Sequence, residues 1–200
     1  MRGLFVTGTD TGVGKTVLSA ALMLRYPGAC YWKPIQTGPD DDTREVQRLS
    51  RGLVLGEGIR LPDPVSPHLA ARRAGTVIDV DALARRVFET PVIVEGAGGV
   101  LVPVNDSQSM ADLMVLLDLP VVVAARSTLG TINHTLLTLE ALRARLLTIA
   151  GVVMIGDSDA DNRAAIESHG RVIAEMPWFR PLSPECLRGW AETLPKDLIA

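Results

Sequence analysis

The chain has 200 residues, a size that one α/β domain can occupy, so we predict a single domain over residues 1–200. Hydrophobic residues make up 47% of the chain and charged residues 22%, and the net charge is −3, a balance typical of a packed globular protein. This composition argues against a disordered chain and against a basic surface that follows phosphates, so we expect no nucleic-acid partner.

Cysteine usage and the N-terminal sequence indicate the compartment. Cys30 and Cys186 stand alone without the pairing of a metal site, and nothing after Met1 resembles a secretion signal. The longest apolar stretches, such as residues 119–125, are much shorter than the roughly 20 residues that a membrane helix needs. We therefore expect a cytoplasmic protein that does not bind a membrane.

Predicted strands and helices alternate along the chain. A β-prone run at residues 3–7 is followed by a glycine-rich turn and by a leucine- and alanine-rich helix at 17–25. Further predicted strands cover residues 30–33, 91–95, 120–125, 150–155 and 172–175. Further predicted helices cover residues 43–51, 80–89, 110–117, 131–146 and 162–169, and proline-rich loops cover 61–67 and 177–184.

Several of these strands are continuous apolar runs, such as VIV (92–94) and GVVMI (151–155), rather than alternating ones. Strands of this kind are buried on both faces, as in parallel sheets covered by helices. The sequence therefore predicts an α/β fold with a doubly wound, mostly parallel sheet flanked by helices.

The segment GTDTGVGKT at residues 8–16 lies between the first predicted strand and the first predicted helix, the context in which a glycine pattern binds phosphate. Its glycines let backbone N–H groups point inward, Lys15 adds a positive charge, and the Thr16 hydroxyl is a ligand for Mg²⁺. Thr9 stands where the usual pattern has its first glycine, and Gly8 comes one residue earlier. A plain strand-to-helix turn is the alternative, but it needs neither the lysine nor the threonine. We predict a P-loop NTPase fold that binds a nucleoside triphosphate with magnesium.

Charged residues follow two other predicted strands, at the edge of the sheet where α/β proteins bind ligands. Glu95 precedes the small residues 96–99, an open place for a carboxylate to meet Mg²⁺. Lys33 precedes Pro34, and beside a phosphate loop it is a candidate second cation for a transferring phosphoryl group. The three aspartates at 40–42 are typical of a solvated turn. Because hard cations prefer oxygen ligands, one of them is also a candidate third Mg²⁺ ligand.

Asn133 and His134 stand in the first turn of the helix predicted at 131–146. A helix start offers N–H groups that suit a carboxylate. Helix capping by Thr131 or Asn133 explains the same pattern equally well, so these residues alone leave both interpretations open.

Six blocks of the sequence, in order along nearly the whole chain, resemble the dethiobiotin synthetase family. They are GTDTGVGKT (8–16), KPIQTG (33–38), SPH (66–68), VEGAGG (94–99), LGTINH (129–134) and PW (177–178). The resemblance implies an ATP-dependent ligase of biotin biosynthesis that closes the ureido ring of dethiobiotin from diaminopelargonic acid and CO₂, through a carbamate and a carbamic–phosphoric anhydride. It also implies a homodimer with the substrate site at the interface.

The resemblance assigns roles to individual residues. Lys33, Lys15 and Thr11 would be catalytic, and Thr16, Asp42 and Glu95 would bind magnesium. The substrate would contact Thr11, Lys15, Lys33, Thr37, Gly130, Thr131 and Asn133, the last three contributed by the partner subunit. The nucleotide would contact Gly12, Val13, Gly14, Lys15, Thr16, Val17, Asp42, Glu95, Gly96, Ala97, Gly98, Gly156, Asp157, Pro177, Trp178, Phe179 and Glu185.

Gly156 departs from that family, which often has an asparagine at this point to read adenine. Because Gly156 lacks the asparagine side-chain amide, we predict weak discrimination between ATP and other nucleoside triphosphates. A partition-type switch ATPase is a rival interpretation, but such proteins carry an additional lysine early in the phosphate loop, where this chain has Thr9, Asp10 and Thr11. An amidating synthetase of the cobyric-acid type would need a glutaminase domain, for which these 200 residues leave no room.

Overall fold

The computed structural model describes residues 2–199, and within them seven strands form one parallel sheet. These strands are β1 (Gly3–Gly8), β2 (Cys30–Trp32), β4 (Leu53–Val54), β6 (Val92–Gly99), β7 (Val121–Arg126), β8 (Ile149–Ile155) and β9 (Val172–Met176). Their order across the sheet is β4-β2-β6-β1-β7-β8-β9, so β1 lies at the centre. Two short strands, β3 (Ile35–Thr37) and β5 (Ile59–Leu61), pair in parallel as a separate small sheet.

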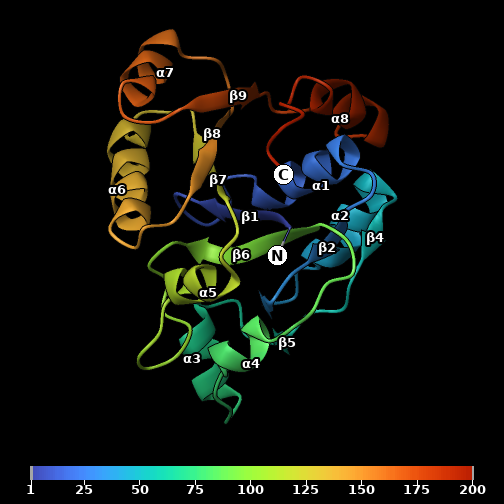
Figure 1. Ribbon diagram of the computed structural model, residues 1–200, viewed down its shortest axis with the longest axis vertical. Helices are drawn as coiled ribbons and strands as arrows, with labels where there is room; N and C mark the ends of the chain where they lie inside the picture. Colours follow the sequence, from blue (N-terminus) through green and yellow to red (C-terminus); the bar gives the residue numbers. More distant parts are fainter. Residues whose placement is uncertain (1, 200) are drawn as a thin grey trace.

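Helices cover both faces of the large sheet (Figure 1). One group consists of α1 (Lys15–Arg25), α2 (Asp42–Ser50) and α8 (Pro184–Ala191). The other consists of α5 (Met110–Leu117), α6 (Thr131–Arg143) and α7 (Ala160–Glu167). Two short helices, α3 (Pro67–Arg73) and α4 (Val80–Ala84), lie near the small sheet at one end of the molecule (Figure 1). Among the helices of residues 2–199, none combines the length and the apolar character needed to cross a membrane.

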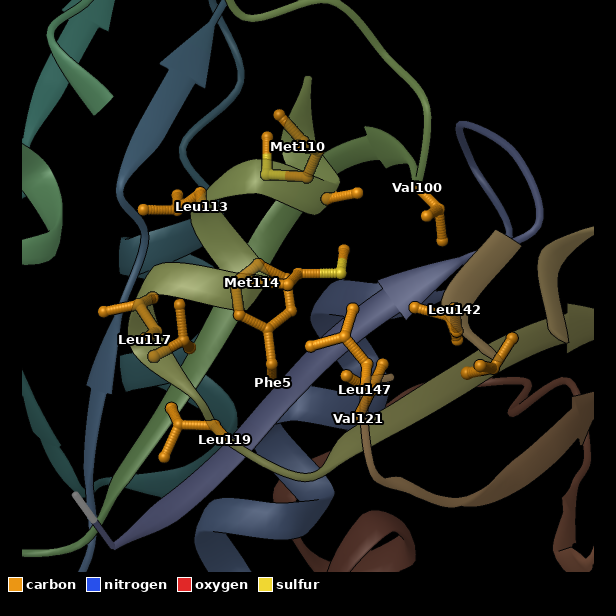
Figure 2. Close-up of a cluster of buried hydrophobic side chains, with 14 of the residues drawn as sticks. Phe5, Val100, Met110, Leu113, Met114, Leu117, Leu119, Val121, Leu142 and Leu147 are labelled. Carbon is orange, nitrogen blue, oxygen red and sulfur yellow. The ribbon is translucent and has the colours of Figure 1, made fainter. Parts of the chain in front are cut away.

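The apolar strand residues divide between two core clusters because successive side chains of a strand point to opposite faces. Leu4 and Val6 of β1 pack in the cluster that includes α1 and α8. Phe5 packs in the other cluster, with Val121 of β7 and Met114 of α5 (Figure 2). All six residues of β1 are buried. The continuous apolar runs therefore reflect strands covered on both sides, which confirms the predicted doubly wound parallel sheet.

The predicted helix at 80–89 is wrong in its second half, because α4 ends at Ala84. The chain leaves the helix to bring Phe88 against Trp32, with ring centroids 5.3 Å apart. The guanidinium of Arg86 lies 5.2 Å from the centre of the Trp32 ring. Tertiary packing on one buried tryptophan therefore overrides the local preference of this segment.

The structure adds elements that the sequence patterns did not predict, namely β3, β4, β5, α3 and α8. Both unpredicted helices begin at a proline, Pro67 in α3 and Pro184 in α8. Each of these prolines was the last residue of a predicted loop. Proline suits the first position of a helix because its missing N–H would have no partner within the helix. The two prolines therefore mark helix starts rather than loop interiors.

Candidate functional site

The loop between β1 and α1 owes its shape to glycine. Gly14, the N-cap of α1, has φ of 97°, a left-handed conformation that residues with side chains rarely adopt. A Cβ at this position would lie 2.9 Å from Ile155 Cδ1. Backbone conformation and packing therefore both require glycine here. Because the first N–H groups of a helix have no partner within it, the start of α1 presents donors to the loop.

Lys15 follows Gly14 and is buried within this loop. Its Nζ donates a hydrogen bond to the carbonyl oxygen of Asp10 at 2.9 Å. Burial lowers the pKa of Lys15 from its usual 10.5 to about 8, against the opposing attraction of Glu95 and Asp42. The side chain thus folds back over the loop, and an anion placed there would favour its charged form.

The three predicted metal ligands lie together at the start of α1. The Thr16 hydroxyl donates to Asp42 Oδ1 at 3.0 Å and to Glu95 Oε1 at 3.1 Å. These oxygens come from three separate elements, because Asp42 is the first residue of α2 and Glu95 lies in β6. The donor set is one that a hard cation such as Mg²⁺ takes. Within residues 2–199 no group of three His, Cys, Asp or Glu could hold a metal, so a cation at this set would depend on the Thr16 hydroxyl as well as on the two carboxylates.

Lys33 lies between the two carboxylates. Its Nζ is 2.7 Å from Asp42 Oδ2 and 2.8 Å from Glu95 Oε1, and it also donates to the carbonyl of Gly96 at 3.1 Å. Burial alone would lower the pKa of Lys33, but Glu95 and Asp42 outweigh it and raise the pKa. For Asp42, burial would raise the pKa, but the neighbouring Lys33 lowers it. Both shifts favour the charged forms of Lys33 and Asp42, which form a cluster with Glu95.

Tyr31 supports the cluster from inside the core. Its hydroxyl donates to Glu95 Oε2 at 2.9 Å, so the two oxygens of Glu95 have different partners. Burial, together with the adjacent Glu95, raises the pKa of Tyr31 well above its usual value of 10. The tyrosine therefore acts as a neutral donor that fixes the orientation of the carboxylate.

We expect Tyr31→Phe to lower the free energy of unfolding by about 1–3 kcal/mol, because it removes a donor from a buried carboxylate. Urea unfolding measures this loss. In the Glu95→Gln background the same substitution should cost less, since the charged acceptor is gone. Equal costs in the two backgrounds would show that the hydroxyl does not act through Glu95.

One cavity of about 580 Å³ unites many of the predicted site residues. The phosphate loop contributes Thr11, Gly12, Gly14, Lys15, Thr16 and Val17. The strand ends and loops that follow them contribute Lys33, Thr37, Asp42, Glu95, Ala97 and Gly98, and Trp178 lies at the same cavity. Sequence reasoning gave no role to several wall residues, namely Ile35, Gln36, Pro64, Val65, Ser66, Pro67 and Val102. Asp40, one of the three aspartates considered as a metal ligand, lines the cavity as Asp42 does. Ile35, Gln36, Ser66 and Pro67 lie inside the blocks that resemble the dethiobiotin synthetase family, which is the signal that could have identified them.

Other predicted contacts do not line this cavity. Val13 is fully buried in the core with α1, and Gly96 offers its carbonyl to Lys33. Phe179 packs at the margin of the same core as Val13. Outside the lining lie also Gly130, Thr131, Asn133, Gly156, Asp157, Pro177 and Glu185.

The start of α6 is joined to the phosphate loop by Arg126 at the end of β7. Its Nη2 donates to Asp10 Oδ2 at 3.2 Å and to the carbonyl of Thr11 at 3.0 Å. The carbonyl of Arg126 in turn accepts a hydrogen bond from the Thr131 hydroxyl. Gly130, with φ of 93°, is the N-cap of α6 and no side chain caps it, so capping by Thr131 or Asn133 is not what the structure shows.

Gly156 follows β8 with φ of 133°. A Cβ there would lie 2.4 Å from Ser127 Oγ and 3.2 Å from Trp178 Nε1. The space that an asparagine side chain would need at this position is therefore filled by a serine and a tryptophan.

Known proteins resemble this chain in both sequence and fold. Residues 2–186 match a family described as an AAA domain. The chain is 53% identical over 181 residues to ATP-dependent dethiobiotin synthetase BioD of Paramagnetospirillum magneticum, which covers 88% of each chain. It is 46% identical over 191 residues to the BioD protein of Brucella ovis, covering 92% of this chain and 90% of that protein. Its fold is similar to that of the cell division ATPase MinD of Pyrococcus furiosus, with a TM-score of 0.60 at 13% identity over 96% of this chain and 98% of that one.

Proposed function

The chain belongs to the ATP-dependent dethiobiotin synthetase family, ligases of biotin biosynthesis, and we propose that it forms the ureido ring through a carbamate and a carbamic–phosphoric anhydride. The observation that carries this proposal is the arrangement in one cavity of the phosphate loop, the buried Lys33 and the two carboxylates that flank it. A phosphoryl group and a small acid brought there would both meet positive charge.

Three bond changes make up the proposed reaction. An amine of diaminopelargonic acid attacks CO₂, forms a C–N bond and loses a proton, giving the carbamate. A carbamate oxygen then attacks the γ-phosphorus of ATP, and the bond to ADP breaks. The second amine attacks the carbonyl carbon of this carbamic–phosphoric anhydride, forms the second C–N bond, loses a proton and displaces phosphate. Negative charge develops on carbamate and phosphate oxygens in the middle step, where cationic side chains stabilise it.

The side chains of the cavity suit these steps. The amides at the start of α1 and Lys15 would hold the β and γ phosphates. Thr16, Asp42 and Glu95 would hold Mg²⁺, which would neutralise phosphate oxygens when bound. Lys33 would keep its charge, because the two carboxylates raise its pKa, and would lie beside the carbamate oxygen. Thr11 and Thr37 would position the diamine or the carbamate.

The proposed subunit arrangement is a homodimer in which α6 of one protomer completes the substrate site of the other. Asn133 is exposed near the start of α6 and does not line the cavity of its own chain. Gly130, Thr131 and Asn133 would then bind the substrate carboxylate across the interface, where helix N–H groups favour an anion.

We expect Asn133→Ala to raise the KM for diaminopelargonic acid roughly tenfold and to leave the KM for ATP nearly unchanged, since one hydrogen bond to a carboxylate is lost. Initial rates at varied concentrations of each substrate give both constants. The reverse pattern, with ATP more affected, would count against a carboxylate site at this helix. Asn162→Ala does not serve as a control for this substitution, because the Asn162 side chain donates a hydrogen bond to the carbonyl of Ser127 within the fold.

The nucleotide base would lie near Trp178, Phe179 and Gly156, with Pro177, Asp157 and Glu185 around it. Gly156 brings no amide side chain to this place, and its surroundings leave no room for one. Weak discrimination between ATP and other triphosphates therefore stays a prediction.

The direct test incubates the protein with diaminopelargonic acid, bicarbonate, Mg²⁺ and ATP and analyses the products by mass. Dethiobiotin together with equimolar ADP and phosphate would support the proposal. Hydrolysis of ATP without dethiobiotin would favour a switch ATPase instead. Isotopically labelled bicarbonate would place its carbon in the ureido carbonyl of the product.

A further inference from the structure

Gln36 holds a buried hydrogen-bond acceptor that has no donor. The residue is the central one of β3 and is only 3% exposed. Its Nε2 donates to the carbonyl of Thr37 at 3.3 Å. Its Oε1 accepts no hydrogen bond from any residue in the part of the chain that the structure describes. Buried side-chain oxygens usually have a partner, so this one calls for a donor from outside the chain.

The orientation of the amide is fixed by its neighbour. Exchanging the oxygen and the nitrogen of Gln36 would place its oxygen against the carbonyl oxygen of Thr37, where two acceptors would repel each other. The nitrogen therefore faces Thr37, and the oxygen is the atom left without a partner.

Gln36 is one of the residues that line the cavity of the site, and because its Oε1 is itself covered, a ligand contact requires the side chain to turn toward the cavity. Gln36 lines it together with Lys33 and Thr37, which are three positions before it and next to it in the chain. Apolar residues also line this cavity, among them Ile35, Val65 and Val102. A ligand with a donor group and an aliphatic chain would satisfy both the oxygen and these apolar surfaces.

Only some groups of the proposed ligands can donate a hydrogen bond to Gln36 Oε1. Phosphate, carbamate and carboxylate oxygens only accept hydrogen bonds when ionised, so none of them can serve Gln36 Oε1. Amines of the substrate carry N–H groups and can. An amide oxygen is also uncharged, so it orients an amine without the strong preference for the ammonium form that a carboxylate would impose. The amine lone pair therefore stays available for attack.

We propose that Gln36 Oε1 accepts a hydrogen bond from an N–H group of the diamine substrate and so helps to position the nucleophile. This contact rests on the function proposed above. It adds to the predicted substrate contacts a residue that recognises the amine rather than the carboxylate or the phosphate.

The test compares Gln36→Met with Gln47→Met. Methionine has nearly the same length as glutamine but offers no strong acceptor. Gln47 lies exposed on α2 and does not line the cavity, so the same exchange there controls for the chemistry of the substitution. We expect Gln36→Met to lower kcat/KM for diaminopelargonic acid by roughly 10- to 100-fold, as for the loss of a buried hydrogen bond to substrate, with the KM for ATP unchanged. Gln47→Met should match the unaltered protein in both constants.

A binding readout completes the experiment. Diaminopelargonic acid should raise the Tm of the unaltered protein and of Gln47→Met, and should raise that of Gln36→Met much less, while ADP with Mg²⁺ should raise all three equally. Gln36→Glu, which keeps an acceptor at this position, should recover part of the diamine effect if the oxygen is what matters. An unchanged kcat/KM for the diamine in Gln36→Met, or an equal loss for ATP, would overturn the contact. If the unaltered protein forms no dethiobiotin and gains no stability from the diamine, the proposed function fails instead, and the contact fails with it.

Discussion

Lys33→Met should lower the turnover of dethiobiotin formation by roughly a thousandfold or more, while nucleotide still binds. Lys33 is the cation between Asp42 and Glu95, and its Nζ is within 2.8 Å of both carboxylates. Without it, the developing charge on the carbamate oxygen would face the two carboxylates with no lysine between them, while Lys15 and a bound Mg²⁺ would still neutralise phosphate oxygens. Methionine preserves the length of the side chain, so the expected loss reflects charge rather than volume.

Single-turnover kinetics and equilibrium binding of a nucleotide analogue measure the two effects separately. Lys196→Met is the matched control, because Lys196 is exposed near the C-terminus and belongs to no part of the site. Removing one partner of a buried ion pair costs about 3–5 kcal/mol of stability, so unfolding must be measured alongside activity. A folded Lys33→Met protein with normal turnover would remove Lys33 from the mechanism.

Lys15→Met should weaken nucleotide binding by roughly 10- to 100-fold or more, because a charged hydrogen bond to phosphate contributes about 1.5–3 kcal/mol. In the structure Lys15 bonds to the carbonyl of Asp10, and burial lowers its pKa to about 8. A bound phosphate would replace that carbonyl as the partner and hold the lysine in its charged form.

Titration calorimetry with ATP and Mg²⁺ measures this loss, and the salt dependence of binding should decrease with it. The free protein should be no less stable than before, since the substitution removes a buried cation whose charged form is disfavoured by desolvation. A Lys15→Met protein that binds ATP normally would show that the backbone amides of the loop suffice.

The sequence predicts those parts of the fold that depend on local pattern. The strands around Phe5, Val94 and Val123 are continuous apolar runs, and their parallel pairing follows from burial on both faces. The small sheet of β3 and β5 was not predicted, because its three-residue strands carry too little pattern. The end of α4 was predicted wrongly because it depends on the distant ring of Trp32.

Some residues of the candidate site could be predicted from the sequence and others could not. Lys15, Thr16 and Glu95 are found from motif spacing and from their position after a strand, and the structure brings them together. Tyr31 could not be found, because its role depends on the register that places its hydroxyl 2.9 Å from Glu95. The block at 33–38 could have marked Gln36 as a residue of the site, but its unpartnered oxygen could not be predicted, since a missing donor is a property of three-dimensional surroundings and not of residue type.

The crowding around Gly156 constrains how this chain can change. An asparagine there would need φ near 133° and would collide with Ser127 Oγ, so a single exchange would carry both backbone strain and a steric clash. Trimming Ser127 would relieve the contact with its Oγ, but Trp178 Nε1 would still lie 3.2 Å from the new Cβ, and the backbone strain would remain. A base-reading amide at position 156 therefore calls for adjustment at positions 127 and 178 as well, so a laboratory selection limited to single substitutions should not produce one.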